Sequence, residues 1–64
     1  MIHTISSAVL LRRLRKAGWV KVHQKGSHVK LKHPVRRGIV VVPHPRKNLP
    51  AGTVRSIFRQ AGWS

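Results

Sequence analysis

The sequence predicts a small α+β domain whose elements follow the order α, β, β, β, α. Two amphipathic segments flank a central region in which apolar and polar residues alternate. The chain has only 64 residues and lacks cysteine, so a thin core must hold it without disulfides. We therefore expect a single domain over residues 1–64, with no room for a second domain or a cofactor-sized cleft.

The first helix is predicted over residues 7–17. Its leucines fall at helical spacing and form an apolar stripe, whereas arginines and a lysine fill the other positions. Ser6 or Ser7 can cap the start by accepting a bond from a free backbone N–H. Gly18 can end the helix, because glycine readily adopts the left-handed conformation found there.

Three strands are predicted after this helix. Residues 19–25 and 28–33 alternate apolar with basic or polar side chains, and Gly26 and Ser27 form a turn between them. Residues 39–42 are a β-branched run that suits a third strand. The three strands are expected to form an antiparallel meander.

One face of this sheet is expected to be apolar and the other basic. Val20 and Val22 of the first strand, and Val29 and Leu31 of the second, should face the core. The opposite face should stay exposed to solvent. If the alternation is unbroken, that face collects Lys21, His23, Lys25, His28, Lys30 and Lys32.

A second helix completes the predicted fold. Residues 43–50 contain several prolines and read as an extended connector, and residues 51–61 place apolar side chains at helical spacing before Gly62. Two helices of about three turns each are sufficient to cover one face of a small sheet.

The charge of the chain points to a polyanionic partner. Lys and Arg number 14 and Asp and Glu number 0, which gives a formal charge of +14. Such a charge repels itself unless nucleic acid, an acidic protein or an anionic membrane takes it up. Membranes are disfavoured, because the longest apolar run is far shorter than the roughly 20 residues that span a bilayer. No signal-peptide pattern is present, so we expect a cytoplasmic protein.

The missing carboxylates also restrict the chemistry. Paired-acid hydrolysis, Asp-based triads and oxygen-rich Mg²⁺ or Ca²⁺ sites all require Asp or Glu. His23 and His28 flank the Gly26 turn on the basic face, where both side chains can point toward one ligand. Zinc is disfavoured, since the strand pattern puts His28 and His33 on opposite faces and no Cys, Asp or Glu completes the ligands. We expect no metal and no cofactor.

The other three histidines have other expected roles. His33 shares the parity of the core residues and should lie at the core margin. His44, between two prolines, should serve the connector or reach a phosphate. His3 precedes the first helix, in a terminus expected to be mobile.

RNA cleavage requires few catalytic groups from the protein, because the substrate supplies its own nucleophile, the 2′-OH. A histidine near that hydroxyl and cations around the phosphate are sufficient. Composition alone nevertheless favours plain RNA binding over cleavage. Trp19 and Trp63 could stack on bases. The stronger expectation is that both tryptophans pack back against the helices that they follow.

An ordered set of motifs runs through nearly the whole chain: Gly18-Trp19, Gln24-Lys25-Gly26-Ser27-His28, His33-Pro34, Val42-Pro43-His44-Pro45, Leu49-Pro50-Ala51-Gly52-Thr53-Val54-Arg55-Ser56-Ile57 and Gln60-Ala61-Gly62. This set resembles the HicA family of bacterial and archaeal toxins. The resemblance implies a double-stranded-RNA-binding-domain-like fold. It also implies metal-independent mRNA cleavage, growth arrest, and neutralisation by a HicB antitoxin encoded beside the toxin. The family's catalytic histidine corresponds to His28.

Two hypotheses follow. In the first, the chain is an endoribonuclease that acts on mRNA with His28 as general base, and Gly26 and Ser27 hold the turn. His23 is the candidate donor to the leaving group, and an acidic HicB-like antitoxin covers the sheet face. In the second, the chain is a noncatalytic basic RNA-binding module, either ribosome-associated or a degenerate toxin copy. In both, RNA is expected to contact Lys21, His23, Lys25, Lys30 and Lys32.

Overall fold

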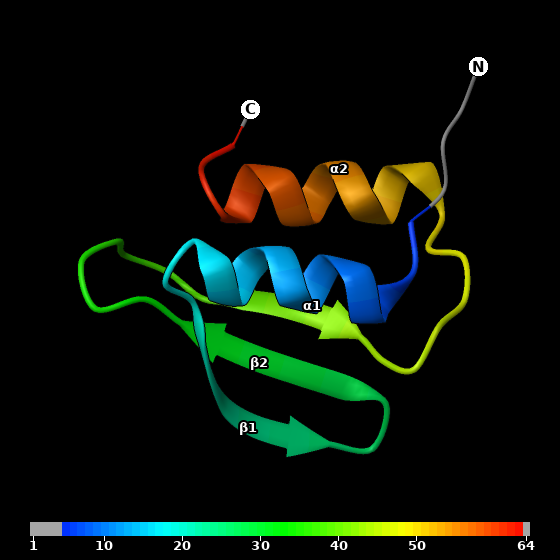
Figure 1. Cartoon of the computed structure of the whole chain (residues 1–64), viewed down its shortest axis with the longest axis horizontal. Coiled ribbons are helices and arrows are strands. Elements are labelled where there is room, and N and C mark those ends of the chain that lie inside the picture. Colours follow the sequence, from blue (N-terminus) through cyan, green and yellow to red (C-terminus); the bar gives the residue numbers. More distant parts are fainter. Residues whose placement is uncertain (1–4, 64) are drawn as a thin grey trace.

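The computed structural model describes residues 5–63, which form two layers. One antiparallel sheet with strand order β1-β2-β3 makes the first layer, and both helices lie on one side of it (Figure 1). The predicted α+β, double-stranded-RNA-binding-domain-like fold is confirmed. The elements are α1 (Ser7–Lys16), β1 (Val20–Lys25), β2 (His28–Lys32), β3 (Val40–Pro43) and α2 (Ala51–Gln60).

α1 begins at a serine cap. The backbone N–H of Val9 donates to the Ser6 hydroxyl at 3.2 Å, so Ser6 is the cap of the two expected candidates. Ser7 becomes the first helical residue, and it is buried. A buried hydroxyl at this position needs partners of its own.

Both helices end in the same way, with the triplet Ala-Gly-Trp. The backbone φ is +99° at Gly18 and +77° at Gly62. The N–H of each following tryptophan donates to the helix carbonyl five residues earlier, at 2.9 Å for Trp19 and 2.8 Å for Trp63. This is a Schellman arrangement. Trp63 meets the ring of Phe58 edge-on at 5.2 Å, and Trp19 is buried, so both contact the fold as expected.

The core lies between the sheet and the helices. Val29 and Leu31 of β2 are buried and alternate with exposed residues. Leu49 is also buried, although the connector between β3 and α2 was expected only to be extended. Its backbone N–H donates to the carbonyl of Ile5 at 2.9 Å, which ties the connector to the chain ahead of α1. The other buried apolar residues are Leu10, Leu11, Leu14, Trp19, Val40, Val42, Ile57 and Ala61.

The expected burial of Val20 and Val22 is wrong. All residues of β1 are exposed, with Val20 at 57% and Val22 at 51%. β1 is the edge strand on the far side of β2 from β3, whereas both helices contact β3 (Figure 1). Val20 pairs with the exposed Lys32, so it lies on the side of the sheet away from the helices. Val22 also belongs to this edge strand, and the main contacts of both helices with the sheet are to β3. No helix within residues 5–63 has the length and apolar character needed to cross a membrane.

Candidate functional site

A two-residue turn places His28 at the start of β2. Lys25 pairs with His28, which leaves Gly26 and Ser27 as the loop. The φ of Gly26 is +57°, and glycine with positive φ at the first loop position is typical of a type II′ hairpin turn. A Cβ on Gly26 would meet nothing within 4 Å, so the backbone conformation alone calls for glycine.

A β-bulge in β1 changes which side chains share a face. Lys21 pairs with Leu31, but His23 pairs with Lys30, so Val22 is an extra residue. One extra residue inverts the alternation of the strand. Lys21 therefore lies on the side of the buried Leu31, and the expectation that it joins the basic face is wrong.

The ammonium group of Lys21 has a local partner instead. It donates to the side-chain oxygen of Gln24 at 3.2 Å. Gln24 pairs with the buried Val29, so it lies on the helix side of the sheet as well. That Lys21 binds RNA stays a prediction. Any such contact would be made from the helix side of the sheet, not from the face that carries the other lysines.

The remaining predicted residues do come together. Lys25 and Pro43 pair with His28 from the two neighbouring strands, and Lys30 lies two residues after His28 on the same face. His23 pairs with Lys30 and completes a cluster on adjacent strands. Side chains opposite each other on neighbouring strands have Cβ atoms about 4.5–5.5 Å apart. We call this surface the open face; its polar residues are His23, Lys25, His28, Lys30 and Lys32, all exposed.

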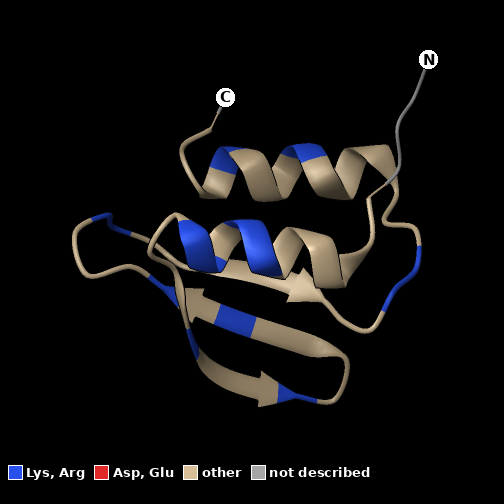
Figure 2. Ribbon diagram, in the orientation of Figure 1, with Lys and Arg blue, Asp and Glu red and all other residues tan. Residues whose placement is uncertain are grey.

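The electrostatics of the open face are uniformly positive. The sequence has no Asp or Glu, so no acidic side chain can neutralise a lysine anywhere on the molecule. Lys and Arg are spread over the sheet, the connecting loops and both helices (Figure 2). An anion bound at His28 would thus meet only attractive side-chain charge.

His33 is a structural residue, as its position at the core margin predicted. Its Nδ1 accepts from the N–H groups of Val35 at 3.0 Å and Arg36 at 3.1 Å. The ring proton is therefore on Nε2, which donates to the carbonyl of Ala17 at 2.9 Å. The ring also meets Trp19 edge-on at 5.2 Å. His33 thus joins the end of β2 to the end of α1.

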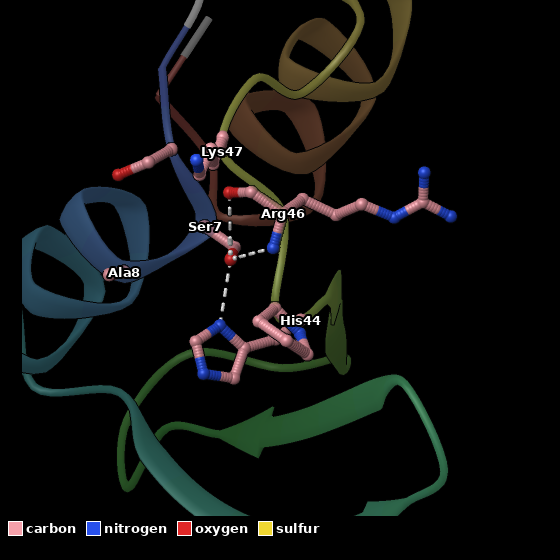
Figure 3. Close-up of a pocket in the computed structure, with 7 residues that line it drawn as sticks. Ser7, Ala8, His44, Arg46 and Lys47 are labelled. Atoms are coloured by element: carbon pink, nitrogen blue, oxygen red, sulfur yellow. Dashed lines mark hydrogen bonds between the residues drawn. The ribbon is translucent and has the colours of Figure 1, made fainter.

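His44 has a role that the sequence did not reveal. Its Nδ1 lies 2.7 Å from the hydroxyl of the buried Ser7 (Figure 3). The same hydroxyl accepts from the N–H of Arg46 at 2.9 Å and lies 3.2 Å from the Arg46 carbonyl. The sequence predicts only a helix-cap role for Ser7, and no local pattern links it to a histidine 37 positions later. His3 lies outside the described residues.

Within residues 5–63, no three His, Cys, Asp or Glu side chains gather as metal ligands would. The titratable groups on the open face are imidazoles and ammonium groups.

A comparison with protein-family models finds a match. The model described as HicA toxin of bacterial toxin-antitoxin systems matches residues 8–63 of the chain. The chain belongs to the HicA toxin family. No curated protein matches it. The match includes all three strands, α2 and all of α1 except Ser7, so the open face of this HicA toxin lies wholly inside the family region. Membership implies a cognate antitoxin as partner.

Proposed function

We propose that this HicA toxin is an endoribonuclease that cleaves mRNA with His28 as general base. The observation that carries the proposal is the exposed position of His28 on the open face, directly opposite Lys25 and beside Lys30. Membership of a toxin family supports a damaging activity rather than passive binding.

In the proposed reaction His28 removes the proton of a ribose 2′-OH. The 2′ oxygen attacks the adjacent phosphorus, the bond from phosphorus to the 5′ oxygen breaks, and a 2′,3′-cyclic phosphate forms. Lys25 and Lys30 stabilise the negative charge that develops on the phosphoryl oxygens. His23, which pairs with Lys30 on the same face, is the candidate donor of the proton to the departing 5′ oxygen. No metal is needed, because the nucleophile belongs to the substrate.

The first prediction tests this mechanism. His28→Ala should lower the cleavage rate by about 100-fold or more, the usual loss when a general base is removed. Products of the wild type should end in a cyclic phosphate, cleavage should persist in EDTA, and an RNA with a single 2′-deoxy substitution should resist cutting at that position. Gln24→Ala is the matched control, since Gln24 is exposed in the same hairpin but lies on the helix side. Cleavage of the deoxy position at the normal rate would overturn the mechanism.

The second candidate function is noncatalytic RNA binding, either at the ribosome or by a degenerate copy. The positive open face is sufficient for it. Expression of the wild type beside His28→Ala separates the two, because equal toxicity and equal RNA decay would favour the binding module.

The proposed partner surface is the open face. We expect the cognate antitoxin to present an acidic region there, because opposite charge speeds capture and a cover over His28 stops the reaction directly. The cytoplasm, where mRNA and a newly made antitoxin meet, is the proposed compartment.

A further inference from the structure

A second basic surface lies on the other side of the sheet from His28. A groove of about 390 Å³ runs between α1 and the segment after β3. Arg12 and Arg15 of α1 line one wall, and His44 contributes the other polar group. The groove shares no residue with the open face. A neighbouring hollow of about 430 Å³ also borders His44, on the side of Ser7 and Arg46 (Figure 3).

The imidazole of His44 is held in a fixed orientation. Its Nδ1 lies 2.7 Å from the hydroxyl of Ser7, which is 1% exposed and also bonded to the backbone of Arg46. A hydroxyl can both donate and accept. Ser7 can thus donate to Nδ1 of a neutral ring that carries its proton on Nε2. It can also accept from a protonated Nδ1, of a neutral ring or an imidazolium, while its own proton goes to the Arg46 carbonyl at 3.2 Å. In every case Nε2 is the ring nitrogen that does not contact Ser7, and it carries an N–H in the imidazolium and in the tautomer protonated there.

The two arginines add donors of the same kind. Arg12 and Arg15 are three residues apart on α1, so they are neighbours on one side of the helix. Both are exposed, and the sequence offers no Asp or Glu to pair with them. Guanidinium groups match the oxygen atoms of a phosphate in a two-point geometry.

We propose that this groove binds a phosphodiester of the RNA backbone, a second RNA contact formed by Arg12, Arg15 and His44. The proposal rests on RNA being the substrate. The groove lies close to the end of the sheet that carries His28. Pro43 pairs with His28, and the N–H of His44 donates to the carbonyl of Ser27 at 2.7 Å. An RNA strand with one phosphate at His28 therefore needs to bend only around this end of the sheet to place another in the groove.

The lining of the groove favours RNA over an acidic segment of the antitoxin. A peptide would bring backbone N–H groups that need acceptors, whereas guanidinium groups have none. The oxygens of a phosphodiester only accept. The polar side chains that line the groove are two guanidiniums, which only donate, and the imidazole of His44.

The second prediction tests the groove by binding, in a His28→Ala background so that the RNA is not cut. Arg12→Gln/Arg15→Gln should weaken the binding of a short fluorescein-labelled single-stranded RNA by about tenfold, the loss of one charge-assisted contact or more. The slope of the log-log salt dependence should flatten by about 0.7, the value for the loss of one phosphate contact on a single strand. Arg13→Gln/Lys16→Gln is the matched control: it removes the same charge from exposed positions of the same helix, outside the groove. Its effect should be about twofold or less.

A second readout reports on His44 itself. Addition of RNA should shift the imidazole ¹⁵N signals of His44 in the parent protein but not in Arg12→Gln/Arg15→Gln. Uridine monophosphate at equal phosphate concentration should shift them little; an equal shift would assign the groove to free nucleotides. Equal losses of RNA affinity in the two double variants would overturn the proposal. So would unchanged RNA affinity together with weaker antitoxin binding, which would assign the groove to the antitoxin.

The two proposals can fail separately. If His28→Ala cuts RNA as fast as the wild type, the catalytic proposal fails while the binding measurements still judge the groove. If the groove variant behaves like its control, the groove proposal fails and the cleavage result stands.

Discussion

The backbone of Gly18 lies close against the ring of His33. A Cβ on Gly18 would come within 2.6 Å of His33 Nε2, and the φ of +99° is already unfavourable for any other residue. His33 cannot easily yield, because its Nδ1 and Nε2 both bond backbone groups. The requirement for glycine is thus steric as well as conformational.

The third prediction compares the two helix-ending glycines. Gly18→Ala should lower the free energy of unfolding by about 2–3 kcal/mol, from the left-handed backbone and a lost hydrogen bond. Gly62→Ala should cost about 1–2 kcal/mol, because a Cβ there meets only the end of the flexible Arg36 side chain. Urea unfolding of both variants measures the difference. Equal losses would show that His33 gives way freely.

At the scale of elements, β1 differs from the other strands. On β3, the N–H of Val41 donates to the side-chain oxygen of Gln60 at 3.2 Å, so α2 covers that edge of the sheet. β1 forms the opposite edge, and every one of its residues is exposed. The strand is therefore held by its pairing with β2 and by the turn rather than by the core.

The fourth prediction concerns the two kinds of valine that result. Val22→Ala should change the free energy of unfolding by less than about 0.5 kcal/mol, as usual for a surface substitution. Val42→Ala removes methyl groups from a residue with 0% exposure and should cost about 2 kcal/mol. Thermal and urea unfolding check both. A large loss for Val22→Ala would mean that β1 is covered in solution, for example by a second copy of the chain.

At the scale of the whole molecule, the charge of +14 is balanced by no acidic side chain. Self-repulsion opposes the compact state, and a thin core has little stability to spare. A partner that neutralises this charge should stabilise the fold, because it binds the folded state preferentially.

The fifth prediction follows for the antitoxin. Its binding should raise the thermal midpoint of the toxin and slow hydrogen exchange at amides from residues 21–32, while amides of α2 serve as the internal control. β1 is an edge strand, so its outward N–H groups are free of sheet pairing and should show the largest change. Protection confined to the helices, with RNA cleavage continuing in the complex, would contradict occlusion of His28.

Much of this protein is determined locally and was accessible from the sequence. The alternation of β2 fixed His28, Lys30 and Lys32 on the exposed side, and the Gly26 turn put Lys25 beside them, because side-chain direction in a strand follows from the pleat. The glycine stops of the helices and the place of His33 at the core margin also follow from local patterns, although the bond from His33 to Ala17 joins residues 16 positions apart.

Only the tertiary structure decided the rest. The bulge at Val22 moved Lys21 to the helix side, since an inserted residue shows itself only in the pairing with the neighbouring strand. The same bulge puts Val20 opposite the exposed Lys32, on the side of the sheet away from the helices, which the periodicity of β1 does not encode. The contact between Ser7 and His44 joins residues 37 positions apart, and packing of the connector against α1 creates it. The local alternation of β2 and the Gly26 turn thus determined that His28 is exposed among lysines. Strand pairing and long-range packing determined which other cations lie on that face and where the second basic groove forms.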